Sequence, residues 1–310
     1  MTCLVIFCFE AWDGLKENAV QQIQTGLGLI QNWREEIEDG FQEPTSKSSA
    51  IIEEDLVRAF SRLDVQAISF AFGEGRSPER QAIVARQERD ILDRIPTIFT
   101  SVQDAEIYES AIIRRTMRFL SFDVPLPKVQ RPSLMFPVNG WYGERSSCVV
   151  TIQQSILMDI SRWQAAFEPL WKRLKAKNDP SLMIAAMLQM HQKSAFAALI
   201  QVCIEDEEKF DDYNYVFAEI VDLAEYSLNV LEAAKPSTPR FQFDSHIVIP
   251  LHMVGHKCRD RAIRRRAISL LLSHPRREGV WDSTLAGGMA EWAMNVEEEQ
   301  LENGHVPGCK

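Results

Sequence analysis

Three histidines in the last third of the chain, His246, His252 and His256, could act as ligands to a metal ion. His252 and His256 are four residues apart in a predicted helix, so both side chains can face one ion. A metal site needs a third or fourth ligand, and no acidic residue stands here in an H-E-x-x-H arrangement. The alternative is a set of polar residues on the flank of a helix. We adopt it, so no metal ligand is predicted.

A block of carboxylates, Glu205 to Glu208 followed by Asp211 and Asp212, could serve acid–base chemistry or hold Mg²⁺. In an all-helical chain such a block also raises the idea of a terpene cyclase, but its spacing fits no diphosphate-binding aspartate motif. The alternative is a solvated turn that leads into a helix, where the helix dipole favours negative charge. We favour this second interpretation.

Patterns that usually carry nucleophilic catalysis or nucleotide binding are missing. The sequence contains no G-x-S-x-G, no P-loop and no G-x-G-x-x-G. We therefore predict no catalytic and no cofactor-binding residue, and the balance favours a protein that is not an enzyme.

Basic residues concentrate in one region, which consists of Lys257, Arg259, Arg261, Arg264 to Arg266, Arg276 and Arg277. They could form a nuclear-import signal or contact phosphate. The preferred interpretation is intramolecular pairing with acidic residues elsewhere, for example Glu205 to Glu208. The whole chain has a formal charge of −10 and a pI near 5.2, which makes it a poor candidate for binding DNA directly.

The six cysteines, Cys3, Cys8, Cys148, Cys203, Cys258 and Cys309, are scattered, and no two form a C-x-x-C pair. This usage indicates free thiols in a reducing compartment. The apolar start lacks the basic residues of a signal peptide and is too short to span a bilayer, so no membrane segment is predicted. It is typical of a buried helix whose beginning has been cut off, which needs cover from another helix or chain.

Apolar residues make up 45% of the 310 residues and recur mostly at helical spacing, which predicts an all-α protein with a substantial core. Helices are expected near residues 4–11, 19–33, 51–70, 104–120, 149–174, 180–203, 213–234 and 285–300 and within 243–283, with a short one possible within 73–97. The stripe of the 104–120 helix is predicted to run through Ile107, Ala111 and Met117. No credible strand pair is found.

Residues 122–147 contain four prolines and two glycines, a composition that predicts a long loop. Residues 34–50 and the tail from Glu302 are also expected to lie outside helices. We predict one domain over 1–310, with an N-terminal half 1–121 and a C-terminal half 148–300. Its helices are expected to form successive antiparallel pairs, loosely like a solenoid.

Trp281-Asp282-Ser283 is expected to begin the last helix. Asp282 or Ser283 can accept hydrogen bonds from the first backbone N–H groups of that helix, and Trp281 would pack as an apolar anchor.

Several motifs together resemble those of a known family. Lys257-Cys258-Arg259-Asp260 leads into Ile263-Arg264-Arg265, and Glu278-Gly279 precedes Trp281-Asp282-Ser283. Upstream, Phe60-Ser61-Arg62-Leu63-Asp64-Val65-Gln66 and the run Phe7-Cys8-Phe9-Glu10 stand in corresponding places. Over roughly residues 3–300 the chain resembles the regulatory (effector) region of fungal Zn2Cys6 zinc-cluster transcription factors.

The resemblance implies an all-helical regulatory region that controls activity, holds dimers or receives signals. It also implies a structural role for the His191 element, which packs between helices in that family. The family's zinc cluster needs six closely spaced cysteines, which this sequence lacks, so sequence-specific DNA binding is not carried over.

The leading hypothesis is a regulator of transcription for a fungal secondary-metabolite gene cluster. It would act in the nucleus, with the cytoplasm as the alternative, through a protein partner or homodimer and under a possible small-molecule effector. A second hypothesis is an enzyme or small-molecule binder of a biosynthetic pathway built on the same scaffold. A third is a truncated gene product.

Overall fold

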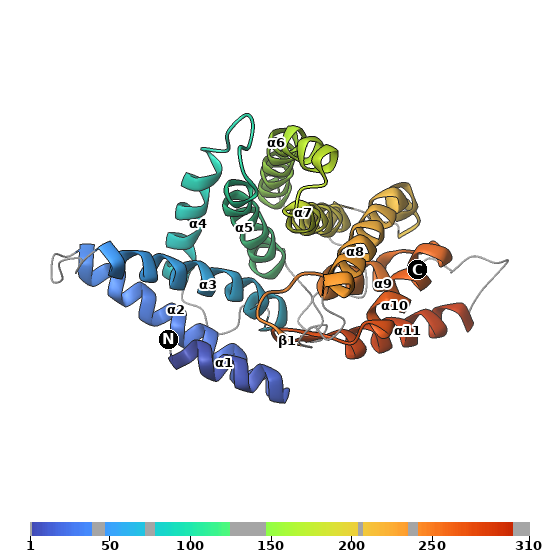
Figure 1. Ribbon diagram of the computed structural model, residues 1–310, viewed down its shortest axis with the longest axis horizontal. Coiled ribbons are helices and arrows are strands. Elements are labelled where there is room, and N and C mark those ends of the chain that lie inside the picture. Colours follow the sequence, from blue (N-terminus) through green and yellow to red (C-terminus); the bar gives the residue numbers. More distant parts are fainter. Residues whose placement is uncertain are drawn as a thin grey trace.

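Helices account for nearly all of the residues that the computed structural model describes, which are 2–38, 47–71, 78–124, 147–203, 207–234 and 241–299. The all-α prediction is thereby confirmed, and most consecutive helices pack against one another (Figure 1). The α-helices are α1 (Thr2–Asp13), α2 (Lys16–Glu38), α3 (Lys47–Ala71), α4 (Pro78–Leu92), α5 (Val102–Arg118), α6 (Ser147–Lys177), α7 (Leu182–Cys203), α8 (Asn214–Ala234), α9 (Val248–Lys257), α10 (Arg261–Ser273) and α11 (Ser283–Glu299). A π-helical turn, η1 (Phe119–Asp123), and a 3-10 helix, η2 (Glu207–Tyr213), complete the helical part.

Local capping signals place several of the helix ends. Ser101 caps α5, since its hydroxyl accepts from the backbone N–H of Asp104 at 3.1 Å. Asp260 caps α10 in the same way, accepting from Ala262 and Ile263 at 2.9 and 3.0 Å. The predicted Pro-rich loop falls mostly on residues 125–146, and these lie outside the described residues, as does the tail from residue 300.

A small three-stranded sheet shows that the prediction of no strand pair was wrong. Strand β1 (Phe241–Gln242) pairs in parallel with β2 (Arg277–Glu278), which pairs antiparallel with β3 (Trp281–Asp282). The turn between β2 and β3 contains Gly279 at a φ of 55°, a backbone conformation that favours glycine. Strands of two residues are too short to show an alternating pattern, which is why periodicity missed them.

The side chain of Gln66 on α3 fastens this sheet to the N-terminal helices. Its amide nitrogen donates to the carbonyl of Phe243 at 2.9 Å, and its amide oxygen accepts from the backbone N–H of Val280 at 3.3 Å. A Cβ atom on Gly279 would overlap the same amide group. Two motifs separated by more than two hundred residues therefore fit together, and both depend on the absence of a side chain at Gly279.

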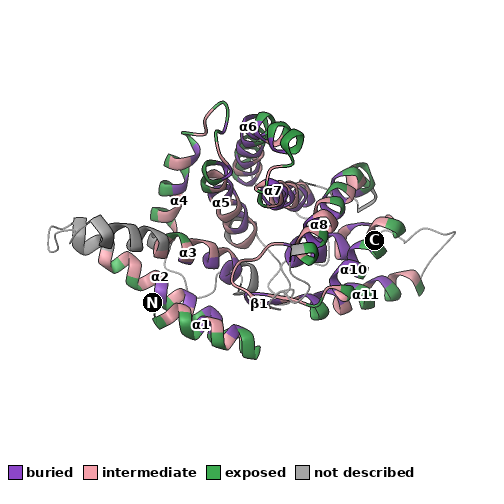
Figure 2. Cartoon of the chain, viewed as in Figure 1, coloured by how far each residue is buried: buried purple, intermediate pink, exposed green. Residues whose placement is uncertain are grey.

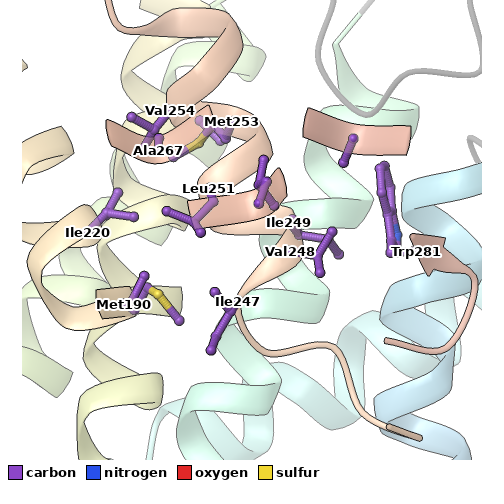
Figure 3. Packing of buried hydrophobic residues seen from close by; sticks show 14 of the residues in the cluster. Met190, Ile220, Ile247, Val248, Ile249, Leu251, Met253, Val254, Ala267 and Trp281 are labelled. Atoms are coloured by element: carbon purple, nitrogen blue, oxygen red, sulfur yellow. The ribbon is translucent and has the colours of Figure 1, made fainter. Parts of the chain in front are cut away.

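Buried side chains form two large clusters, and each draws on both sides of the 125–146 segment. The first joins α1, α2 and α3 to α7, α8, α9 and α10, and Figure 3 shows Val248, Leu251 and Trp281 among its members. The second joins α4 and α5 to α6 and α7 around Trp163, whose ring stacks on Phe167 at 4.4 Å. Figure 2 shows buried residues where helices face each other and exposed ones along their outer sides.

Arginines of α10 pair within the molecule, as predicted. Arg264 donates to the carbonyl of Gly255 at 2.7 Å and contacts Glu297, and Arg265 pairs with Glu298. Arg266 pairs with Asp222 and Glu225 on α8. The example partners given above, Glu205 to Glu208, have side chains outside the described part of the chain.

Among the helices that the structure describes, none combines the length and the apolar character that a membrane span needs.

Candidate functional site

A cavity of about 380 Å³ lies between helices in the middle of the molecule. Its walls come from α3, α5, α7 and α8, from the segment 242–246 and from the first turn of α9, elements that Figure 1 shows around the centre. A volume of this size is typical of a pocket for a small organic ligand.

Most of the cavity wall is apolar, and methionine is prominent in it. Met117 of α5 and Met183 and Met187 of α7 line the cavity together with aliphatic side chains. The apolar lining further includes Val65, Ile113, Ile184, Leu188, Ala195, Ala198, Leu231, Ile249 and Pro250. Methionine is unbranched and polarisable, so this wall can adapt to apolar bodies of different shape.

One group of polar side chains in the wall is a buried glutamate–histidine pair. Nδ1 of His191 on α7 lies 3.0 Å from Oε1 of Glu109 on α5, and Nε2 lies 2.8 Å from the carbonyl oxygen of His246. Because a carbonyl only accepts, Nε2 must carry a hydrogen. The Nδ1–Oε1 contact then holds one proton, which belongs either to an imidazolium or to a neutral carboxyl group.

The surroundings of His191 favour the imidazolium. Burial by itself lowers the pKa of His191, but the hydrogen bond and charge of Glu109, the carbonyl of His246 and the charge of Glu278 raise it. The net result is a pKa above the ordinary value of 6.5. His191 therefore connects α5 to the chain before α9 as a hydrogen-bonded link within the cavity wall.

A second polar group in the wall combines two carboxylates with an arginine. Nε of Arg62 on α3 donates to Asp244 at 2.9 Å, whereas its Nη1 lies 3.7 Å from Glu106 on α5. Burial raises the pKa of Glu106, as do the charges of Glu109 and Asp244, and the guanidinium groups of Arg62 and, more weakly, Arg58 on α3 oppose them. Glu106 is thus a carboxylate whose negative charge is only partly compensated.

Glu278 of β2 holds the wall segment that contains His246. One oxygen, Oε2, accepts from the backbone N–H groups of His246, Ile247 and Val248 at 2.7, 2.9 and 3.0 Å. These are the free donors at the start of α9, where an anion is favoured. Burial lowers the pKa of His246, whose ring lies parallel to that of His191 at 6.4 Å.

The three histidines considered as metal ligands do not form one site. His246 lies at the cavity, whereas the rings of His252 and His256 are 4.3 Å apart, and Nδ1 of His252 lies 3.2 Å from the carbonyl of Ala286. Burial lowers the pKa of His252 to about 4 and that of His256 to about 3. No group of three or more potential metal ligands occurs within the described residues.

Two other predicted features are located by the structure. Asp282 caps α11 by accepting from the N–H of Leu285 at 2.9 Å, and Trp281 is buried, as expected. Ser283 does not share the capping, since its hydroxyl instead accepts from the N–H of Arg276 at 2.9 Å. His191 does link helices as predicted, but its place in a cavity wall was not foreseen.

The remaining candidates lie apart from the cavity or outside the described part. Four cysteines are described as free thiols, namely Cys3, Cys8, Cys148 and Cys258. Burial raises the pKa of Cys258 to about 12, which makes its thiol unreactive. Of the acidic block, Asp211 pairs with Arg259 at 3.6 Å.

Sequence reasoning missed Arg62, Glu106 and Glu109 as members of a site. A signal existed for Glu109, which shares the buried face of α5 with Ala105 and Ile112. An acid among apolar positions on one helix face indicates either a buried pair or a binding pocket.

Comparisons with known proteins add no relative. No protein-family model matches the chain, and no curated protein or solved structure matches it significantly.

Proposed function

We propose that this protein is a regulator of transcription whose activity is set by a small molecule bound in the central cavity. In this proposal it acts in the nucleus on a fungal secondary-metabolite gene cluster, and the 310 residues of the sequence contain no closely spaced cysteines that could form a zinc cluster. The observation that carries the proposal is the cavity itself, whose walls are shared by α3, α5, α7 and α9. A ligand there would contact helices from distant parts of the sequence and could alter how they are held together.

The proposal includes the arrangement that the sequence predicted. The chain is one regulatory domain with halves 1–121 and 148–300, and its helices follow one another as antiparallel pairs in a solenoid-like order. Contacts between successive helices, such as α1 with α2 and α7 with α8, support this order.

The proposal also includes contact with a protein partner or with a second copy of the chain, through which the protein would act. It is supported by α1, on which Val5, Phe9 and Trp12 are 52%, 71% and 59% exposed. Apolar side chains that cluster on a surface mark sites of protein contact. Sedimentation of the purified protein, alone and with Phe9→Ser and Trp12→Ser, tests whether this face forms a homodimer.

The decisive experiment deletes the gene and measures both transcripts of neighbouring biosynthetic genes and the metabolites of the pathway. The regulator proposal expects those transcripts to fall. Complementation with Ser194→Phe, which fills the cavity, should fail to restore regulation. The same change at exposed Ser161 on α6 should restore it. Unchanged transcripts after deletion would overturn the proposal.

A second candidate function is an enzyme of the same pathway. The Glu109–His191 pair favours it, because a shared proton at a cavity wall is suited to acid–base chemistry. Accumulation of one intermediate with constant neighbouring transcripts would select this candidate.

A further inference from the structure

The charged side chains that line the cavity are mostly acidic. Three carboxylates line it, those of Glu106, Glu109 and Asp244, and the only arginine or lysine among the described lining residues is Arg62. Each carboxylate differs in how well it is balanced. Asp244 has the 2.9 Å bond from Arg62, and Glu109 has the proton shared with His191. Glu106 has the contact of 3.7 Å with Arg62, which is longer than a hydrogen bond, and the weaker influence of the charge of Arg58 on α3.

The polar and apolar parts of the wall follow each other along α5. Glu106, Glu109 and Ser110 come first, and Ile113 and Met117 follow on the same face one and two turns later. A ligand that lies along this helix would therefore place one end against carboxylates and the other against methionine and isoleucine.

We propose that the cavity binds an organic cation, with its ammonium group against Glu106 and its apolar body against the methionine wall. This inference rests on the proposed function, since it names the class of ligand for the same cavity. An anion of the same shape would meet three carboxylates and would have to displace Asp244 or Glu106 from Arg62. A neutral molecule would leave the charge of Glu106 as it stands.

Three probes with one rigid body and different head groups test this inference: adamantan-1-amine, adamantan-1-ol and adamantane-1-carboxylate. Binding to the full chain is measured by isothermal titration calorimetry near pH 7.5. The amine is expected to bind at least about tenfold more tightly than the alcohol, the size of effect that a hydrogen bond to a charged group supplies. The carboxylate is expected to bind most weakly.

Charge variants then locate the head group. Glu106→Gln should weaken amine binding about tenfold and leave alcohol binding unchanged. Arg62→Gln should tighten amine binding, because it removes the competing cation, so the two variants move affinity in opposite directions. Glu168→Gln, at an exposed carboxylate on α6, is the matched control and should change nothing.

Dependence on pH supplies an independent readout. Amine binding should weaken as the pH falls and Glu106 takes up a proton, and this loss should disappear in Glu106→Gln. The other ionisable groups that line the cavity or act on Glu106 are Arg58 and Arg62 on α3, Glu109 on α5, His191 on α7, and Asp244 and His246 before α9. They are present in both proteins, so the difference isolates Glu106.

The outcomes separate the two levels of inference. Amine binding that is selective, weakened by Glu106→Gln and blocked by Ser194→Phe supports both. The cation inference is overturned if the carboxylate or the alcohol binds as tightly as the amine or more tightly. It is also overturned if Glu106→Gln binds the amine with unchanged affinity. In both cases the cavity remains a ligand site. If no probe binds, or if Ser194→Phe leaves binding intact, both the cation inference and the ligand-controlled function fail.

Discussion

Glu278 and Glu109 are both glutamates with almost no exposed surface, 0% and 4%, yet their partners differ in kind. Glu278 accepts three hydrogen bonds from backbone N–H groups at the start of α9. Glu109 meets the imidazole of His191 and, at 3.4 Å, the hydroxyl of Ser110, and it borders a cavity. Backbone donors are fixed by the fold, whereas side-chain donors can turn, exchange protons or give way to a ligand.

This contrast distinguishes two regions made from similar residues. The junction of the small sheet with α9, α10 and α11 holds buried polar groups against backbone partners, as Arg264 also shows. The cavity wall holds its charges against each other and leaves Glu106 incompletely balanced. Buried charge at the junction serves the scaffold, whereas the partly exposed charges of Arg62, Glu106 and Asp244 at the wall can meet a ligand.

The largest effect is expected at the junction. Glu278→Ala leaves three buried backbone donors without their acceptor and should lower the free energy of unfolding by about 3–5 kcal/mol. Urea denaturation measures it. Glu291→Ala, on the exposed side of α11, is the control and should stay within about 0.5 kcal/mol of the parent. If Glu278→Ala lowered the free energy of unfolding less than Glu109→Ala does, the proposed difference between the junction and the cavity wall would be wrong.

Acid should weaken the junction through His252. Its pKa is lowered from 6.5 to about 4, so the unfolded chain takes up a proton before the folded one does. The interval of roughly 2.5 pH units, at about 1.4 kcal/mol each, corresponds to about 3 kcal/mol of stability lost between pH 6.5 and 4. Denaturation series at several pH values should show this loss reduced in His252→Gln. If the free energy of unfolding fell equally with pH in the parent and in His252→Gln, this role of His252 would be contradicted.

The cavity wall should respond to pH with the opposite sign. The pKa of His191 is raised, so its contribution to stability is complete below 6.5 and is lost as the pH rises through the folded-state pKa. An NMR titration of the imidazole should find a pKa above 6.5 that falls in Glu109→Gln. A double-mutant cycle with His191→Gln should give a coupling of about 1–2 kcal/mol below pH 6.5. No change of pKa in Glu109→Gln would show that the pair is not coupled.

The smallest effect on stability is expected where an exposed ion pair is removed. Arg266 is 42% exposed and pairs with Asp222 and Glu225 on α8. Arg266→Ala should cost less than about 1 kcal/mol, and raised salt should reduce that cost further. Arg264→Ala, which removes a buried arginine, is expected to cost more in the same urea titration.

The sequence predicted the helices better than it predicted the site. Strong apolar periodicity anticipated α6, whose stripe through Ile156, Ile160 and Trp163 is buried. On α5 the predicted stripe was wrong at Ile107, which is 46% exposed, because the buried face instead carries Glu109. A polar residue on the inner face displaces the apparent stripe, and the same residue marks the cavity.

The cavity could not be predicted because it is made by tertiary contact. Arg62, Glu106, His191 and Asp244 lie on four segments that no local pattern connects. The motif that contains Arg62 and Gln66 stood out only through its resemblance, and its physical purpose emerges where Gln66 meets Gly279.

The hydrogen bond between Gln66 and Val280 also has a consequence for folding during synthesis on the ribosome. These residues are 214 positions apart, and translation proceeds at about 5–20 residues per second, so roughly 10–40 seconds separate the synthesis of one from that of the other. During that interval α3 has left the ribosome without the strand pair that completes it. The N-terminal helices must therefore wait, with apolar faces uncovered, for the C-terminal segment to emerge. The buried cluster that α1, α2 and α3 share with α7 to α10 can therefore form only late in synthesis.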